Sequence, residues 1–299
     1  LSLSLSGRWW PGMASPASGV CGDDSCDGGE MGPERPAPLH HEIVERIQSG
    51  GEGRRVRAAM EIRLLTKASP ELRRQLSWAV EPLVGMLRSG SLRCSEAALL
   101  ALPNLAAKNE RNKTKIVDAG ALEPLTSFLQ STNTTLQEHA TAAILTLSAS
   151  SINKPRISTA GAIPLLVTIL RDGNRQARID AVMTLYNLST LPDNLHVILS
   201  VKPIPPLVSL LKICRKSSKT AEICCALLES LLVFDEGRTT LTAQEGGVLA
   251  LVEVLEEGSL QGREHAVGGL LTMCVSDRRR YREVILKEGV IPGLLELTV

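Results

Sequence analysis

The sequence predicts an all-α fold, an armadillo/HEAT-like right-handed α-solenoid of about six repeats. Related segments recur at spacings of 42, 41, 41, 44 and 43 residues along most of the chain. Within each repeat the apolar residues follow helical spacing, and aromatic residues make up only 2% of the chain, so Leu, Ile, Val and Ala must form the core. A period near 40 with helical patterning is typical of such solenoids, in which stacking buries an apolar face that one repeat cannot bury alone.

The first helix of each repeat is predicted from a segment that recurs along the chain. The copies begin at residues 78 (WAVEPLVGML), 120 (GALEPLTSFL), 161 (GAIPLLVTIL), 202 (KPIPPLVSLL), 246 (GGVLALVEVL) and 289 (GVIPGLLELT). A fainter copy begins near residue 38. Glycine at the start accepts the left-handed conformation that ends the preceding short helix, and proline is tolerated in the first turn of the next helix. We assign these roles to Gly120, Gly161, Gly246 and Gly289, and to Pro124, Pro164, Pro205 and Pro292.

A second, longer helix follows in each repeat, as residues 95–107 and 179–190 show most clearly. When the copies are aligned on Asn104 and Asn187, a small residue stands six positions earlier. These residues are Ala58, Ala98, Ala143, Ala181, Cys224 and Ala266. A small side chain at fixed helical spacing marks the place where a neighbouring helix approaches closely. Cys224 and Cys225 are therefore expected to be packing residues, since buried thiols behave as small hydrophobes.

The repeats resemble armadillo repeats, most closely the C-terminal armadillo domain of plant U-box ubiquitin ligases. The residues that carry the resemblance are 58–67 (AAMEIRLLTK), 136–150 (LQEHATAAILTLSAS), 160–173 (AGAIPLLVTILRDG) and 180–190 (DAVMTLYNLST). The likeness covers roughly residues 40–299. It implies a partner-holding domain, without the U-box that in this family docks the ubiquitin-conjugating enzyme, because residues 1–39 contain no matching apolar pattern.

The chain divides into two parts. Residues 1–39 are rich in Gly, Pro, Ser and Asp and are predicted to be a disordered N-terminal segment. Residues 40–299 are predicted to be the armadillo-repeat domain, whose last repeat is incomplete. The final segment exposes leucines that a second helix would normally cover, so we expect either a longer natural protein or self-association at the uncapped C-terminal end.

Composition excludes several classes of function. A net charge of +1 and few aromatic residues argue against a nucleic-acid partner, and no apolar run is long enough for a membrane span. Seven cysteines at irregular spacing favour a reducing compartment, cytoplasmic and/or nuclear. Nucleophile-elbow, phosphate-loop and metalloprotease motifs are missing, so we expect no catalytic residue, cofactor or metal site.

The candidate binding residues lie on the second helix, which lines the concave groove of an armadillo superhelix. By resemblance to nuclear-import armadillo proteins, the position of Asn104 and Asn187 would contact a peptide backbone. Its other occupants include Ser230 and Thr272, and no repeat has the Trp that those carriers place four residues earlier. Eight residues before this position stand the acidic residues Glu96, Glu222 and Glu264. They suit a basic partner segment, although a solvated helix face explains them as well.

These observations predict a non-catalytic scaffold that binds a partner or substrate protein in its groove, linked by resemblance to plant ubiquitination. An alternative is a fragment of a complete U-box ubiquitin ligase whose U-box is missing here. A karyopherin-like carrier is disfavoured, because the ladder of Trp and Asn is broken.

Overall fold

The computed structural model describes residues 38–296, and all regular structure in this part is helical. The prediction of an armadillo-type α-solenoid is confirmed. Residues 38–299 form one compact unit, and its first helix begins at Pro38, two residues before the predicted boundary. The segment predicted to be disordered otherwise lies outside the described residues.

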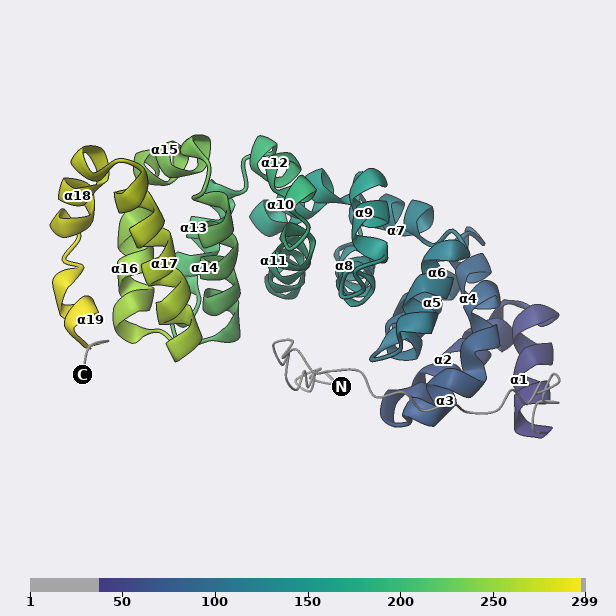
Figure 1. The fold of residues 1–299 in the computed structure, drawn as a ribbon. Coiled ribbons are helices and arrows are strands. Elements are labelled where there is room, and N and C mark those ends of the chain that lie inside the picture. Colours follow the sequence, from purple (N-terminus) through teal and green to yellow (C-terminus); the bar gives the residue numbers. More distant parts are fainter. Residues whose placement is uncertain (1–37, 297–299) are drawn as a thin grey trace, which may run out of the picture. The chain divides into compact units, whose positions relative to one another are not determined.

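Each complete repeat consists of a short, a medium and a long helix, arranged in a row (Figure 1). The short helices are α3 (Pro70–Gln75), α6 (Glu110–Asp118), α9 (Asn153–Thr159), α12 (Pro192–Ser200), α15 (Asp235–Ala243) and α18 (Arg278–Lys287). The medium helices are α1 (Pro38–Gln48), α4 (Val80–Leu87), α7 (Leu122–Leu129), α10 (Ala162–Asp172), α13 (Ile204–Ile213), α16 (Gly247–Glu257) and α19 (Ile291–Glu296). The long helices are α2 (Glu52–Ala68), α5 (Leu92–Ala106), α8 (Thr134–Ser148), α11 (Arg175–Ser189), α14 (Lys219–Leu231) and α17 (Leu260–Ser276).

The turns into the medium helices follow the predicted glycine rule, with one substitution. Gly120, Gly161, Gly246 and Gly289 have φ angles of 80°, 76°, 63° and 79°. In the fifth copy Lys202 takes the same place with a φ of 55°, a conformation that a residue with a Cβ adopts at a cost. The copy at Trp78 has no such turn, and a 3-10 helix, Leu76–Ala79, leads directly into α4 instead.

The long helices begin with a recurrent polar cap. The five cap residues are Ser91, Asn133, Asn174, Ser218 and Ser259. In every case the side-chain oxygen accepts a hydrogen bond from a backbone N–H of the first turn, at 2.9–3.3 Å. Such a cap stabilises a helix by about 1 kcal/mol, and it fixes where each long helix starts against its neighbour.

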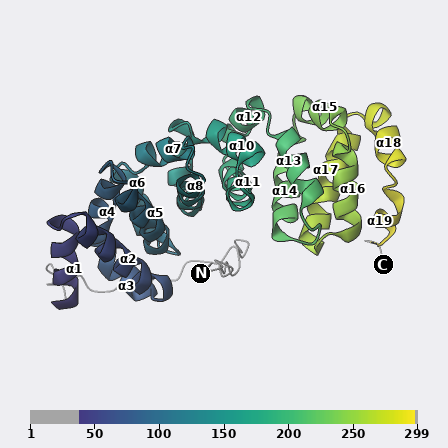
Figure 2. The ribbon, with the colours of Figure 1, turned by 180° about the vertical axis from the view of Figure 1, so that it is seen from behind.

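The core lies where consecutive long helices pack against one another in chain order, as the view from behind also shows (Figure 2). Five of the six small residues predicted for the close contact are fully buried, and Ala143 is 2% exposed. The aliphatic residues four positions later are also buried: Ile62, Leu102, Leu147, Leu185, Leu228 and Leu270. The periodic stripe therefore forms the interface between repeats.

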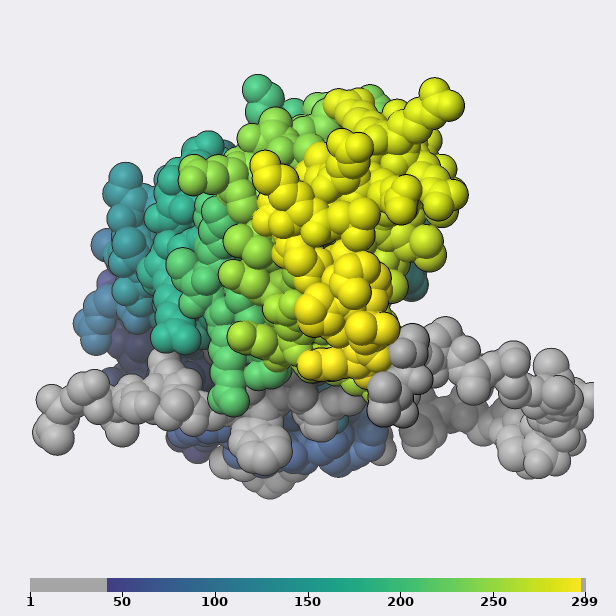
Figure 3. All heavy atoms as spheres, turned by 90° about the vertical axis from the view of Figure 1, so that its left-hand side faces the viewer, coloured from purple at the N-terminus to yellow at the C-terminus, as the bar shows by residue number. Residues whose placement is uncertain are grey.

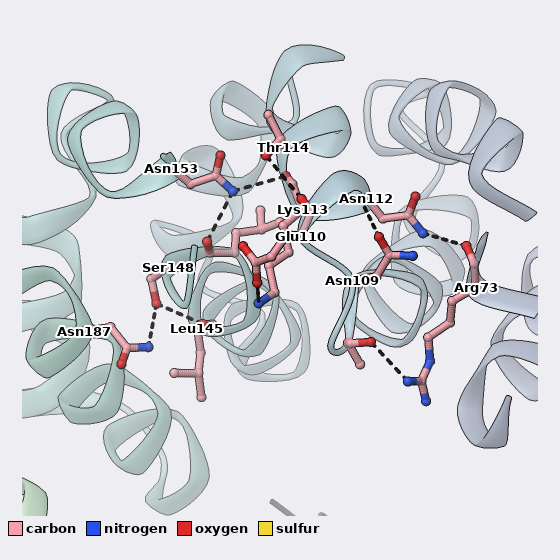
Figure 4. A network of polar contacts seen from close by, with 12 residues as sticks. Arg73, Asn109, Glu110, Asn112, Lys113, Thr114, Leu145, Ser148, Asn153 and Asn187 are labelled. Carbon is pink, nitrogen blue, oxygen red and sulfur yellow. Dashed lines mark hydrogen bonds and ion pairs between the residues drawn. The ribbon is translucent and has the colours of Figure 1, made fainter. Parts of the chain in front are cut away.

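A second set of polar residues, which we call the clasp residues, joins the short helices to the long helices before them. Asn153 on α9 donates from Nδ2 to the carbonyls of Leu147, at 3.2 Å, and Lys113, at 3.1 Å (Figure 4). The clasp residues of the first five short helices are Arg73, Asn112, Asn153, Asn194 and Arg238. Each satisfies carbonyls at the C-terminal end of a long helix, which lack partners within the helix.

No single helix among the described residues is long and apolar enough to cross a bilayer. Only the pair α12 and α13, taken together across a bend of 88°, satisfies length and composition.

Candidate functional site: the long-helix face

The candidate site is a surface built from the same three positions of every long helix. We call it the long-helix face, and define it by the position of Asn104 and Asn187 together with the positions four and eight residues earlier. Because α2, α5, α8, α11, α14 and α17 contact one another in sequence, these positions form three rows that run across the repeats.

Each of the two asparagines forms a hydrogen bond to the long helix before its own. Asn104 is half-buried, and its Nδ2 donates to the carbonyl oxygen of Arg63 at 3.2 Å. Asn187 is only 7% exposed, and its Nδ2 donates to Ser148 Oγ at 3.0 Å (Figure 4). Arg63 on α2 and Ser148 on α8 occupy the same position of their repeats, one residue before the asparagine position. One N–H of each amide is thus used within the fold, so both asparagines have a structural role.

The two hydroxyl residues at this position serve their own helices. Ser230 Oγ donates to the carbonyl of Ala226 at 3.0 Å, and Thr272 Oγ1 donates to that of Gly268 at 2.8 Å. Such bonds to the carbonyl four residues earlier are local, and leave the hydroxyl oxygen free to accept.

The three acidic residues fall into two groups. Glu96 and Glu264 are exposed and have no ion pair with any part of the chain that the structure describes. Glu222 is 8% exposed and forms an ion pair with Lys219 on the same helix. Free carboxylates therefore lie on the second and the last long helix, α5 and α17, while the third carboxylate is already paired with a neighbour.

An apolar row on the first four repeats was not predicted as part of the site. Met60, Leu100, Leu145 and Met183 are half-buried at the position four residues before the asparagines, and Leu64 beside them is 69% exposed. In the last two repeats the row ends with Ala226, buried, and Gly268. The sequence contained a signal for this row, because a Leu or Met recurs at the same position of four long helices. We considered that position only for the Trp that nuclear-import armadillo proteins have there.

An ionisable pair between α14 and α17 was also missed. His265 Nδ1 lies 2.8 Å from Glu229 Oε2, with both side chains about one-third exposed. A Cβ added at Gly268 would lie 1.9 Å from Glu229 Oε1, so glycine gives this carboxylate its room. Because Glu229 and His265 are 36 residues apart in the sequence, no local sequence pattern predicts the pair.

The cysteines near this face are buried. Desolvation raises the pKa of Cys225 to about 12 and that of Cys224 well above its usual range. Both side chains pack in the core, which agrees with the packing role expected for them. Among residues 38–296, no three His, Cys, Asp or Glu side chains come together in a group that could hold a metal ion.

Comparison with known sequences places the repeats in a defined group. A family model described as the plant U-box protein ARM repeat region matches residues 41–297. U-box domain-containing protein 3 of Arabidopsis thaliana is 39% identical over 71 residues, which are 24% of this chain and 9% of that protein. U-box domain-containing protein 4 of Arabidopsis thaliana is 35% identical over 109 residues, 36% of this chain and 13% of that protein. The matches thus span a small part of each relative.

Solved structures share the fold. A designed armadillo repeat protein in complex with the peptide (KR)4 has a TM-score of 0.68 at 20% identity, covering 79% of this chain and all of the designed one. An engineered protein has a TM-score of 0.75 at 24% identity, covering 85% of this chain and 62% of its own.

Proposed function

Because the chain belongs to the family of plant U-box protein ARM repeat regions, we propose that it is a non-catalytic scaffold that binds a partner or substrate protein on the long-helix face. The pathway proposed for it is plant ubiquitination, in the cytoplasm and/or the nucleus. In this pathway the chain holds a polypeptide, and other components carry out ubiquitin transfer.

The observation that carries this proposal is the repetition of the face itself. All six long helices present equivalent positions, with half-exposed aliphatic side chains along the first four repeats and free carboxylates at Glu96 and Glu264. An extended polypeptide also repeats along its length, so it can meet equivalent positions on several repeats at once. The designed armadillo relative in complex with (KR)4 is a precedent for a basic peptide on this fold.

The proposed ligand contacts use the residues singled out above. Amide and hydroxyl groups of Asn104, Asn187, Ser230 and Thr272 would bond a ligand backbone, and Glu96, Glu222 and Glu264 would receive basic side chains. The free carboxylates Glu96 and Glu264 should contribute most, since Glu222 already has Lys219 as a partner.

The test uses the alternating Lys-Arg octapeptide as a probe, with an alternating Asp-Glu octapeptide as the charge control, in a fluorescence-polarisation titration. We expect the basic peptide to bind, and Glu96→Lys with Glu264→Lys to weaken it at least tenfold. Glu236→Lys with Glu245→Lys, at exposed residues of α15 and of the turn after it, is the charge-matched control away from the face and should leave binding unchanged. Equal weakening by the control would mean that only net charge matters, and no binding by the wild type would refute a basic ligand.

A second candidate is that the chain is a fragment of a complete U-box ubiquitin ligase. The observation in its favour is that the matched stretches are only 9% and 13% of relatives named for a U-box domain. A full-length transcript that encodes a U-box in the same reading frame would establish it. In a reconstituted assay we expect this chain alone to give no ubiquitin transfer above the control without it, and robust transfer would overturn the non-catalytic proposal.

A further inference from the structure

A pocket of about 280 Å³ lies between the first two short helices, α3 and α6, and we call it the short-helix pocket. One wall is a single face of α3 and the turn after it, formed by Pro70, Arg73, Arg74 and Ser77. The other wall is the loop before α6 and the first turn of that helix, residues 108–112. Asn112 joins the two walls, because its Nδ2 donates to the carbonyl of Arg73 at 2.7 Å (Figure 4).

The lining of this pocket is positively charged. Its charged side chains are four cations and a single carboxylate: Arg73, Arg74, Lys108, Arg111 and Glu110. Glu110 is paired with Lys113 at 2.6 Å, and Arg74 is paired with an acidic residue of its own helix. Lys108 and Arg111 are exposed and form no ion pair within residues 38–296. The pocket therefore carries positive charge that the protein itself does not neutralise.

Arg73 adds a buried charge to this lining. It is 8% exposed, and its guanidinium donates to the carbonyls of Thr66, Lys67 and Ala107 at 2.8–3.1 Å. No carboxylate of the described part of the chain is among its partners, and two of the five N–H groups of an arginine remain. Desolvation lowers the pKa of Arg73, because burial removes water from the charged form. An anion in the pocket would compensate for that lost water.

The role of a clasp residue does not require this charge. The next three short helices use a neutral residue for the same purpose: Asn112, Asn153 and Asn194. Arg238, the other charged clasp residue, lies 3.4 Å from the carboxylate of Asp235 on its own helix. Among the five clasp residues, only Arg73 thus has a charge without an acidic partner in the described structure, which indicates a ligand rather than a structural need.

The first turn of α6 adds uncharged donors to the pocket. The backbone N–H groups of Glu110 and Arg111 have no acceptor within residues 38–296, as is usual at the start of a helix. Asn109 accepts from the N–H of Asn112 through its Oδ1, at 3.0 Å, so its Nδ2 remains as a donor. Cationic side chains and the N–H groups of a helix N-terminus are the groups that bind phosphate oxygens in proteins.

We propose that the short-helix pocket binds the phosphate group of a phosphorylated serine or threonine of a partner protein. Lys108 and Arg111 pair with the phosphate from the rim, and the remaining N–H groups of Arg73 and of the first turn of α6 donate to its oxygens. A phosphate monoester carries about two negative charges at neutral pH, and the three cations without a carboxylate partner offset them.

The lining favours a phosphorylated protein over other phosphate compounds. No aromatic side chain lines the pocket, so a nucleotide base would have no ring to stack on. The carbonyls that Arg73 binds lie at the C-terminal ends of α2 and α5, and α5 also carries Asn104 of the long-helix face. A polypeptide on that face would pass close to the pocket. The choice of a protein as the carrier of the phosphate therefore rests on the proposed function, whereas phosphate binding itself does not.

The experiment measures binding of three labelled peptides to the whole chain by fluorescence polarisation. The peptides consist of Gly and Ala around one central residue, which is phosphoserine, serine or glutamate. We expect the phosphoserine peptide to bind, and the other two to bind at least tenfold more weakly. Since these probes contain no Lys or Arg, a failure to bind them would leave the proposed binding of basic peptides on the long-helix face untouched.

Variants of the chain locate the site. Lys108→Glu with Arg111→Glu should weaken binding of the phosphoserine peptide at least tenfold. The charge-matched control is Arg278→Glu with Arg279→Glu, at exposed residues of α18 that form no ion pair within residues 38–296, and it should leave binding unchanged. Helix α18 lies at the C-terminal end of the row, which faces the viewer in Figure 3. Arg73→Asn, which introduces the clasp residue of the next three short helices, should weaken binding while thermal unfolding shows an intact fold.

Equal binding of the phosphoserine and serine peptides would overturn the proposal, as would equal weakening by the two pairs of charge reversals. Tighter binding of inositol hexakisphosphate, or of vesicles that contain a phosphatidylinositol phosphate, than of the phosphoserine peptide would refute the assignment to a partner protein.

Discussion

The contact between α8 and α11 and the contact between α14 and α17 have the same packing but different polar chemistry. In both, an alanine that is fully buried marks the close approach, Ala181 on α11 and Ala266 on α17. Near it, Asn187 donates to the buried hydroxyl of Ser148 in the first contact, whereas His265 bonds the partly exposed carboxylate of Glu229 in the second. The packing position repeats because neighbouring long helices approach one another in the same way in every repeat. The polar pair near it differs from one contact to the next, both in residue type and in position on the helix, so differences in ligand preference can arise there.

The largest expected effect comes from a clasp residue of the middle repeats. Asn153→Leu removes the donor for two carbonyls, and a buried polar group without a partner costs about 1–3 kcal/mol. We expect a loss of about 2–4 kcal/mol in chemical denaturation. Arg238→Leu should cost less, because one of its carbonyl bonds lies at the exposed surface. If Arg238→Leu lost more stability than Asn153→Leu, the expected order of these two clasp residues would be wrong.

The packing position should respond equally in different repeats. Cys224→Leu and Ala181→Leu both place a large side chain where neighbouring helices touch, and overpacking of this kind costs about 1–3 kcal/mol. Cys224→Ala keeps the small volume and should be mild. If the leucine variants unfold at the same denaturant concentration as the wild type, the position is not a close contact.

The polar position of the last contact can be examined by a double-mutant cycle. Gly268→Ala improves helix propensity by up to about 1 kcal/mol, but its methyl group displaces the Glu229 carboxylate from His265. In a Glu229→Ala background we expect Gly268→Ala to stabilise the protein by about 0.5–1 kcal/mol. In the wild type the gain should be smaller. Equal effects in the two backgrounds would show that Glu229 and Gly268 are not coupled.

The buried thiols predict a dependence of stability on pH. Cys225 ionises near its usual pKa of about 8.5 when unfolded but has a pKa of about 12 when folded, so its contribution is complete below pH 8.5 and is lost as pH rises toward 12. Between pH 8 and 9 the loss is about 0.7 kcal/mol for this one thiol. For Cys225→Ala, the urea concentration at the midpoint of unfolding should fall less steeply as pH rises than it does for the wild type. An identical slope for both proteins would mean that the thiol is accessible to water.

Local and periodic features could be predicted from the sequence. The glycine turns require only one residue type in one conformation, and the small-residue stripe repeats at a fixed helical position. The pair of Glu229 with His265 could not be predicted, because it depends on how two helices that carry residues 36 apart are set against one another. The clasp bonds to the long helices span only six or seven residues, but they cross the bend between a long helix and the next short helix, and helical spacing does not give the geometry of that bend. Glu222 has the spacing of a residue of the long-helix face, but burial and an ion pair with Lys219 on its own helix reduce its availability. The seven predicted binding residues otherwise remain predictions about ligand contact.

The clasp residues also determine how such a chain can change in length. Asn112, Asn153 and Asn194 are 41 residues apart, and each bonds only the long helix just before it and, for the first two, the preceding short helix. Excision of a segment of 41 residues would therefore give every remaining clasp an equivalent carbonyl to bond. Loss of half a repeat would leave a clasp opposite the wrong helix. Recombination between related genes would then tolerate gains and losses of whole repeats. The number of ligand positions would change in steps, while the clasp bonds at each remaining repeat are kept.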